Sequence, residues 1–135
     1  MITAVDTNVL IDVFTADKTY AEKSATALEQ SIQKGRVVVC EVVWAETCAL
    51  FSNDRDFESA MHELGIELSP MGESCAQRAG GVWRQYRKSG GKRTRMIADF
   101  MIGAHALSQC DRLLTRDRGF FRKYFTKLNI FDPSK

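Results

Sequence analysis

The sequence predicts an α/β fold in which helices flank a central parallel sheet. Short runs rich in apolar and β-branched residues, such as 2–5 and 36–40, alternate along the chain with longer stretches of helical periodicity. This alternation is typical of parallel strands that are joined by helical crossovers. The 135 residues suit one domain with a sizeable core, and no linker or low-complexity segment divides them. We therefore expect a single domain over residues 1–135.

The first half of the chain supplies three strands of the predicted sheet. The strand 2–5 ends at Asp6, and apolar side chains at helical spacing follow from near Asn8. Gly35 and Gly65 stand where helices commonly stop, which allows the chain to return to the next strand. The expected elements are a short helix from residue 8, a helix over 18–33, a strand over 36–40, a helix from residue 41, a helix over 54–64 and a strand over 66–68.

The second half of the chain continues the alternation. Ser69 has the chemistry of a helix start, with Pro70 near the first turn and Glu73 early in the helix. A basic loop, Ser-Gly-Gly-Lys-Arg-Thr-Arg over residues 89–95, then precedes the next helix. The expected elements are helices over 69–87 and 96–107, a strand over 111–115, a short helix over 117–124 and a strand over 127–131.

The composition excludes several classes of protein. A hydrophobic fraction of 44% and a charged fraction of 27% are ordinary for a globular domain. No apolar run approaches the ~20 residues of a membrane span, and no signal peptide precedes the first strand, so we expect a cytoplasmic protein without a membrane partner. The four cysteines form no Cys-x-x-Cys pair, which favours free thiols over a zinc site. A net charge of +2 is too small to identify a nucleic-acid-binding protein by itself.

Four carboxylates are expected at one edge of the predicted sheet. Asp6 ends the first strand, and Glu46 lies about one and a half turns into the helix after the second strand. Asp99 opens the helix that precedes the strand 111–115, and Asp117 follows that strand. Ligand sites of open α/β sheets lie outside the carboxyl ends of the strands, so these acids are candidates for one common site.

The chemistry of such a group points to a divalent metal. Converging carboxylates repel one another, and a hard divalent cation with oxygen ligands removes that repulsion. Because no His or Cys accompanies the acids, Mg²⁺ or Mn²⁺ is favoured over zinc. In phosphodiester hydrolysis such ions activate a water and stabilise the charge of in-line displacement. Thr7 and Asn8 are expected to orient Asp6, and Thr115 is expected to act in the same way near Asp117.

Basic residues near these acids are candidate contacts for a phosphate backbone. Lys92, Arg93 and Arg95 directly precede the helix that carries Asp99, and Arg116 is the neighbour of Asp117. Phosphate contacts of this kind depend on salt and are largely blind to sequence. For any one of these residues, a solvated surface charge is an equally good interpretation.

The four segments that carry the acids resemble the motifs of PIN-domain ribonucleases. The resemblance extends in order over nearly the whole chain and implies a central parallel sheet and an endoribonuclease that depends on Mg²⁺ or Mn²⁺. It also implies that Asp6, Glu46, Asp99 and Asp117 are the catalytic and metal-binding residues. One departure is Arg116, because many relatives carry Asn or a second polar residue near Thr115. The segments are Ala4-Val-Asp-Thr-Asn-Val-Leu10, Val42-Val-Trp-Ala-Glu46, Ala98-Asp-Phe-Met-Ile-Gly-Ala-His-Ala-Leu107 and Leu113-Leu-Thr-Arg-Asp-Arg-Gly-Phe120.

The compact length of the chain is similar to that of the VapC toxins of bacterial toxin–antitoxin pairs. For that branch, the resemblance implies inhibition by a cognate VapB-like antitoxin and formation of homodimers.

Two other functions fit parts of the sequence. A haloacid-dehalogenase-like phosphatase would use Asp6 as nucleophile, but such sites usually need a second Asp two residues on, where this chain has Asn8. A catalytically inactive PIN-like module for RNA binding or assembly is the second alternative, and the intact acids argue against it. Asp12 is expected on a solvated helix face, and His105 is expected to pack or to be partly exposed rather than to perform acid–base chemistry.

Overall fold

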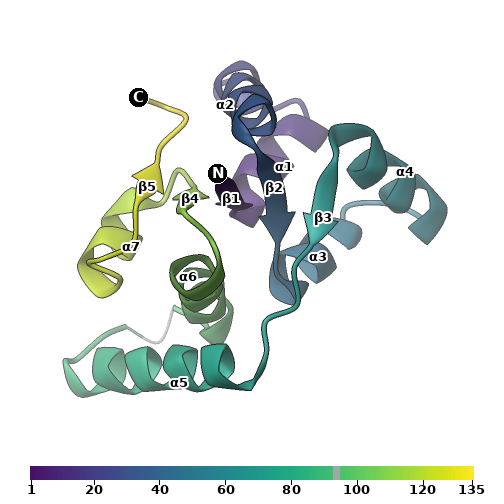
Figure 1. Cartoon of the computed structure of the whole chain (residues 1–135). Helices are drawn as coiled ribbons and strands as arrows, with labels where there is room; N and C mark the ends of the chain where they lie inside the picture. Colours follow the sequence, from purple (N-terminus) through teal and green to yellow (C-terminus); the bar gives the residue numbers. More distant parts are fainter. Residues whose placement is uncertain (93–94) are drawn as a thin grey trace.

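The computed structural model describes residues 1–92 and 95–135, which form a five-stranded parallel sheet and seven helices (Figure 1). The prediction of a single α/β domain with a central parallel sheet is confirmed. Across the sheet the strands are ordered β3-β2-β1-β4-β5. Their bounds are β1 (Ile2–Val5), β2 (Arg36–Val39), β3 (Ile66–Leu68), β4 (Arg112–Leu114) and β5 (Ile130–Phe131).

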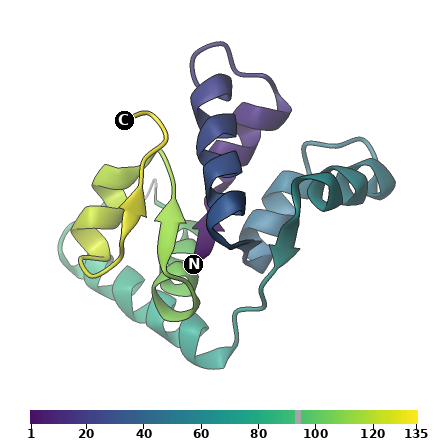
Figure 2. The ribbon, with the colours of Figure 1, turned by 45° about the horizontal axis from the view of Figure 1, so that its top comes forward.

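The strand β1 lies at the centre of the sheet. Its residue Ala4 lies opposite Val38 of β2 on one side and opposite Leu113 of β4 on the other. The chain first extends the sheet from β1 to β3 and then returns past β1 to add β4 and β5, so β3 and β5 form the two edges (Figure 2). This reversal creates a topological switch point at the carboxyl ends of β1 and β4, where open α/β sheets bind their ligands.

Helices cover both faces of the sheet. The helices α1 and α2 pack together on one side, and α5 and α6 pack together on the other (Figures 1 and 2). As parallel sheets require, strand residues such as Val38 and Leu113 are at most 1% exposed. The bounds are α1 (Thr7–Phe14), α2 (Ala21–Lys34), α3 (Glu41–Cys48), α4 (Asp54–Leu64), α5 (Glu73–Lys88), α6 (Ile97–Gln109) and α7 (Arg118–Tyr124).

An aromatic cluster anchors the start of α6. The ring of Phe100 is fully buried and lies 5.3 Å from the ring of Tyr86 in α5 and 5.2 Å from that of Phe120 in α7. Burying a side chain of this size contributes about 1.5–3 kcal/mol, and the edge-on ring contacts add to it. The cluster therefore fixes the first turn of α6, which carries Asp99, against α5 and α7.

The start of α5 differs from the prediction. The helix begins at Glu73 rather than at Ser69, so Pro70 does not lie in its first turn. The reason is that Ser69 continues the sheet, because its backbone N–H donates to the carbonyl of Val39 at 2.8 Å. Gly72 then has a φ of +86°, which lies in the left-handed region and delays the helix until the next residue.

The structure also describes the cysteines and the hydropathy of the helices. All four cysteines are free, with Cys40 and Cys75 buried and Cys48 and Cys110 partly buried, as the sequence predicts. Of the helices in the described part of the chain, none combines the length and the hydropathy that spanning a membrane requires.

Candidate active site

The structure places the predicted acids around the switch point of the sheet. Asp6 follows β1 directly, and its backbone N–H donates to the carbonyl of Leu114 at 2.9 Å, which holds it beside the end of β4. Asp117 is the third residue after β4, Asp99 lies in the first turn of α6, and Glu46 lies in α3. All four acids therefore come from segments that begin near the carboxyl edge of the sheet.

Asp6 is the buried member of the group, with 7% of its surface exposed. Its Oδ2 accepts hydrogen bonds from the Thr115 hydroxyl at 2.8 Å and from the Asn8 amide at 3.2 Å. The Thr115 hydroxyl oxygen in turn accepts the backbone N–H of Asp117 at 3.0 Å. Thr115 therefore connects Asp6 to the segment that positions Asp117.

The carboxylates perturb one another electrostatically. Burial raises the pKa of Asp6 to about 6; the hydrogen bonds from Thr115 and from the Thr7 backbone oppose this shift, while the negative charges of Asp99 and Asp117 add to it. The pKa of Asp99 is also raised, mainly by burial and further by the charges of Asp117 and Glu46, against the lowering effect of Arg95. The negative charge of this group is thus costly in the absence of a cation.

Arg95 supplies one positive charge to the group. Its Nη1 lies 2.7 Å from Oδ2 of Asp117 and 3.6 Å from Oδ2 of Asp99, and its guanidinium carbon lies 4.2 Å from the centroid of the Phe120 ring. The side chains of Arg95, Asp99 and Asp117 are each about one-third exposed. The arginine therefore bridges two of the four acids while it remains accessible to solvent.

Two of the three predicted supporting residues make contacts other than those expected. Asn8 contacts Asp6 as predicted, but the hydroxyl of Thr7 donates to Glu46 Oε1 at 2.6 Å rather than to Asp6. Thr115 bonds with the carboxylate of Asp6, whereas it meets Asp117 only at the backbone. The reason is that α1 turns the hydroxyl of its first residue towards α3, while β1 and β4 run side by side and bring Thr115 to Asp6.

The four basic candidates lie in different surroundings. Lys92 is exposed, and its backbone carbonyl accepts the hydroxyl of Tyr86 at 2.6 Å. Arg95 contacts the acids, and Arg93 lies outside the described residues. Arg116 is held by an acid, because its Nε and Nη2 donate to the two carboxylate oxygens of Asp12 at 2.7 and 3.0 Å.

The prediction for Asp12 is wrong, because this residue is only 1% exposed. In addition to Arg116, its Oδ2 accepts the Ser24 hydroxyl at 2.7 Å, and the Arg116 guanidinium lies 4.0 Å from the centroid of the Tyr20 ring. A buried carboxylate needs such partners. One signal in the sequence was available: Asp12 stands four residues after Asn8 and so shares the helix face that points towards the residues after β4. His105 is also buried, at 1% exposure, which agrees with a packing role.

The donor chemistry fits a hard divalent cation, since the group offers carboxylate oxygens and its negative charge is costly. Within residues 1–92 and 95–135, however, no three Asp, Glu, His or Cys side chains stand together in an arrangement that could hold one ion. The guanidinium of Arg95 contacts carboxylate oxygens of two of the four acids, Asp117 and Asp99.

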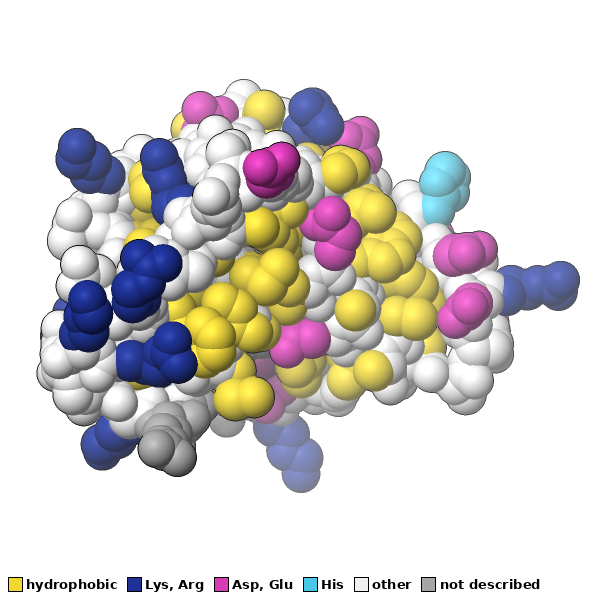
Figure 3. All heavy atoms as spheres, turned by 90° about the horizontal axis from the view of Figure 1, so that it is seen from below, with side chains coloured by type: hydrophobic (Ala, Val, Ile, Leu, Met, Phe, Trp, Pro, Cys, Tyr) yellow, Lys and Arg dark blue, Asp and Glu magenta, His cyan; other side chains and the backbone are white. Residues whose placement is uncertain are grey.

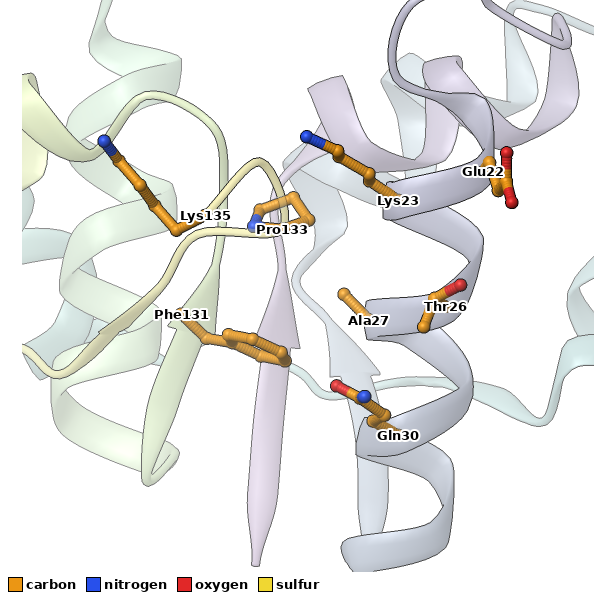
Figure 4. Close-up of a pocket in the computed structure, with 8 residues that line it drawn as sticks. All are labelled: Glu22, Lys23, Thr26, Ala27, Gln30, Phe131, Pro133 and Lys135. Atoms are coloured by element: carbon orange, nitrogen blue, oxygen red, sulfur yellow. The ribbon is translucent and has the colours of Figure 1, made fainter.

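A separate cavity of about 400 Å³ lies between α2 and the chain around β5 (Figure 4). Lys23 and Lys135 extend from its two sides, and Glu22 is the one carboxylate among the residues that line it. None of the four predicted acids belongs to its lining, so the cavity is not part of the carboxylate group.

Comparisons with known proteins agree with this architecture. The family profile of the PIN domain matches residues 3–126. A structure of VapBC-1 from nontypeable Haemophilus influenzae has a TM-score of 0.76 and 24% identity, with 100% of each chain covered. FitAB bound to an IR36 DNA fragment has a TM-score of 0.72 and 26% identity over 100% of this chain and 96% of the other. A toxin–antitoxin complex from Klebsiella pneumoniae has a TM-score of 0.69 and 20% identity over 97% of each chain. A search of curated proteins gave no match.

Proposed function

Because the chain belongs to the PIN-domain family, we propose that it is an endoribonuclease dependent on Mg²⁺ or Mn²⁺ and the toxin of a type II toxin–antitoxin system. One observation supports the proposal: burial, together with the negative charges of Asp99 and Asp117, raises the pKa of Asp6 to about 6 at the switch point of the sheet. Such a group is poorly suited to a purely structural role, because the repulsion between neighbouring carboxylates destabilises a fold.

In this proposal Asp6, Glu46, Asp99 and Asp117 hold the metal. The bound ion would supply an activated water and would stabilise the charge that develops during in-line displacement at phosphorus. The contribution of the chain itself is orientation, since Asn8 and Thr115 donate to Oδ2 of Asp6 and fix that carboxylate.

The RNA backbone would approach along the basic end of the molecule. Viewed from below, Lys and Arg side chains gather at the end of the face near α7 and the last turn of α5, whereas Asp and Glu side chains lie nearer its middle and the end near α4 (Figure 3). The last turn of α5 contains Arg87 and Lys88, and that of α7 contains Arg122 and Lys123. Lys92 and Arg95 lie between this region and the acids. We propose that Arg93 contacts the RNA backbone as well. Arg116 would first have to leave Asp12 to contact RNA.

The proposed partner is a VapB-like antitoxin. The structural neighbours come from VapBC and FitAB assemblies and from a toxin–antitoxin complex. Each of them matches nearly the whole of this chain. This similarity supports both a toxin role and an antitoxin partner, and we extend the proposal to a homodimer as the form of the toxin.

Cleavage of RNA by purified protein tests the proposal. The wild type should cut a structured RNA when Mg²⁺ or Mn²⁺ is present and should lose this activity in EDTA. Asp6→Asn should reduce cleavage to background, whereas Glu63→Gln, which changes the same charge on the exposed part of α4, should leave it unchanged. Equal metal-dependent cleavage by the wild type and Asp6→Asn would refute the assignment.

A catalytically inactive RNA-binding or assembly module is the second candidate. The observation that favours it is the pairing of Arg95 with Asp117 and Asp99, which leaves fewer carboxylate oxygens for a metal. This candidate predicts that RNA is retained but never cut with either metal, and that expression of the protein alone does not arrest growth.

A further inference from the structure

Arg95 forms a short ion pair with the carboxylate group. Its Nη1 approaches Oδ2 of Asp117 to 2.7 Å and Oδ2 of Asp99 to 3.6 Å. The hydrogen bond and the charge of Asp117, together with the charge of Asp99, raise the pKa of Arg95 despite partial burial, so the guanidinium remains positively charged. Asp99 and Asp117 are two of the residues that the proposed function assigns to metal binding.

The guanidinium is positioned by its surroundings on two sides. The face of Phe120 supports it at 4.2 Å, and this ring is itself 93% buried within the aromatic cluster of α5, α6 and α7. The backbone that leads to it is tied to α5, because the Tyr86 hydroxyl donates to the carbonyl of Lys92 and the N–H of Gly91 donates to the carbonyl of Tyr86. The pair with Asp117 is therefore part of a defined arrangement and not a chance meeting of two flexible surface side chains.

We propose that Arg95 is an internal counter-ion that competes with the divalent metal for Asp99 and Asp117 and is released to contact RNA when the metal binds. This inference rests on the proposed function, since it requires a metal at these carboxylates. Arg95 would then serve two states of the same site. Without metal it neutralises part of the repulsion among the acids, and with metal its positive charge becomes available to the substrate.

The competition follows from the charges. An arginine and a divalent cation need the same carboxylate oxygens, so each lowers the apparent affinity of the group for the other. Each contact of a partly exposed ion pair is worth up to about 1 kcal/mol, which corresponds to a factor of about five in affinity. With two carboxylates involved, removal of the arginine should tighten metal binding by about fivefold to thirtyfold.

A basic hollow lies beside Arg95 and could receive the released guanidinium. Arg95 lines a hollow of about 440 Å³ that is also lined by Lys92, Phe120 and Lys123. Two ammonium groups and an aromatic ring offer a phosphate and a base favourable contacts there. Arg95 thus lies at the boundary between the carboxylate group and a basic surface.

The test compares the wild type with Arg95→Gln, Arg95→Lys and the control Arg84→Gln, which removes one positive charge from an exposed position on α5. Affinity for Mn²⁺ alone is measured from calorimetric titration of the metal-free proteins, without RNA. The KM for RNA and kcat are then measured at saturating Mn²⁺. We expect Arg95→Gln to bind Mn²⁺ about fivefold to thirtyfold tighter and to show a higher KM for RNA, with Arg84→Gln unchanged in both. Arg95→Lys keeps the charge and should lie between the wild type and Arg95→Gln, so it decides the question if Arg95→Gln does not fold.

Tighter Mn²⁺ binding combined with a higher KM for RNA distinguishes the counter-ion role from a purely structural or purely RNA-binding role. An arginine that only stabilised the fold would, when replaced, weaken both metal and RNA binding, and an arginine that only contacted RNA would leave Mn²⁺ affinity unchanged. Either result would overturn the inference while leaving the metal-dependent nuclease intact. If none of the proteins binds Mn²⁺, the proposed metal site fails and the counter-ion role of Arg95 fails with it.

Discussion

The substitution Asp6→Asn should stabilise the metal-free protein at neutral pH. In the folded chain the pKa of Asp6 is raised from 3.8 to about 6, mainly by burial, so the fold favours the protonated form. Above pH 6 the carboxylate is ionised in both the folded and the unfolded protein. The free energy of unfolding is then about 3 kcal/mol lower than with a neutral side chain, since one pKa unit corresponds to 1.36 kcal/mol. Asn is neutral and similar in shape, and its Oδ1 can still accept from Thr115 and Asn8.

The sign of the pH dependence follows from the same shift. Because the folded pKa lies above the unfolded one, the penalty is absent below about pH 3.8, grows as the pH rises to about 6 and is complete above it. For a domain of this size, a gain of about 3 kcal/mol raises Tm by up to about 10 °C. Thermal unfolding followed by circular dichroism in EDTA measures this gain directly, at pH 7.5 and again at pH 4.

A matched control separates this effect from a general loss of negative charge. Glu63→Gln removes one carboxylate from an exposed position and should leave Tm nearly unchanged at both pH values. Asp6→Asn should exceed the wild type by several degrees at pH 7.5, and this advantage should shrink towards zero at pH 4. A variant that is less stable than the wild type at pH 7.5, or a difference that does not depend on pH, would refute the reasoning.

Three further substitutions test other parts of the structure. Asp12→Ala should lower the free energy of unfolding by about 3 kcal/mol, because it leaves Arg116 without its carboxylate partner; urea titration measures this, and a change below 1 kcal/mol would contradict the assignment of a buried ion pair. Thr115→Val should lower the free energy of unfolding by about 1–2 kcal/mol and the rate of RNA cleavage at least tenfold, since the hydroxyl donates to Asp6 and accepts from the backbone of Asp117. Unaltered cleavage would show that the hydroxyl of Thr115 is unimportant for the site. Gly103→Ala should lower Tm, because a Cβ there would collide with the ring of Phe125 at a cost of about 1–3 kcal/mol. Gly80→Ala, which has open space in α5, should be neutral or stabilising. Equal Tm changes in the two variants would argue against the packing of α6 on Phe125.

Sequence patterns predicted the framework because they report on burial and backbone geometry. The strand over 2–5 and the helix 54–64 follow from apolar spacing and from Gly65, whose φ of +69° ends α4 as expected. The strand ends were predicted well enough to place Asp6 directly after β1 and Asp117 shortly after β4. The late start of α5 was not predicted, because the backbone bond of Ser69 to Val39 depends on the neighbouring strand.

Side-chain partners were harder to predict than elements. Whether Arg116 faces a phosphate or Asp12 depends on the path of the three residues after β4, which no local pattern specifies. The same holds for Arg95, whose partner Asp117 is 22 residues away, and for Thr7, which bonds with Glu46 rather than with its neighbour Asp6. These contacts arise from tertiary placement, so only the residue types and not their pairing could be anticipated.

The central position of β1 has a consequence for synthesis of the protein. Asp6 is made before its hydrogen-bond partner Thr115, which follows 109 residues later. At about 5–20 residues per second, the ribosome needs roughly 5–20 s to deliver it, and contacts of such long sequence separation form late in folding. The carboxylate group therefore cannot assemble on a nascent chain until β4 has emerged and paired with β1. An activity that depends on this group therefore begins only after Thr115 has been made and β4 has paired with β1, which leaves an interval before the site can act.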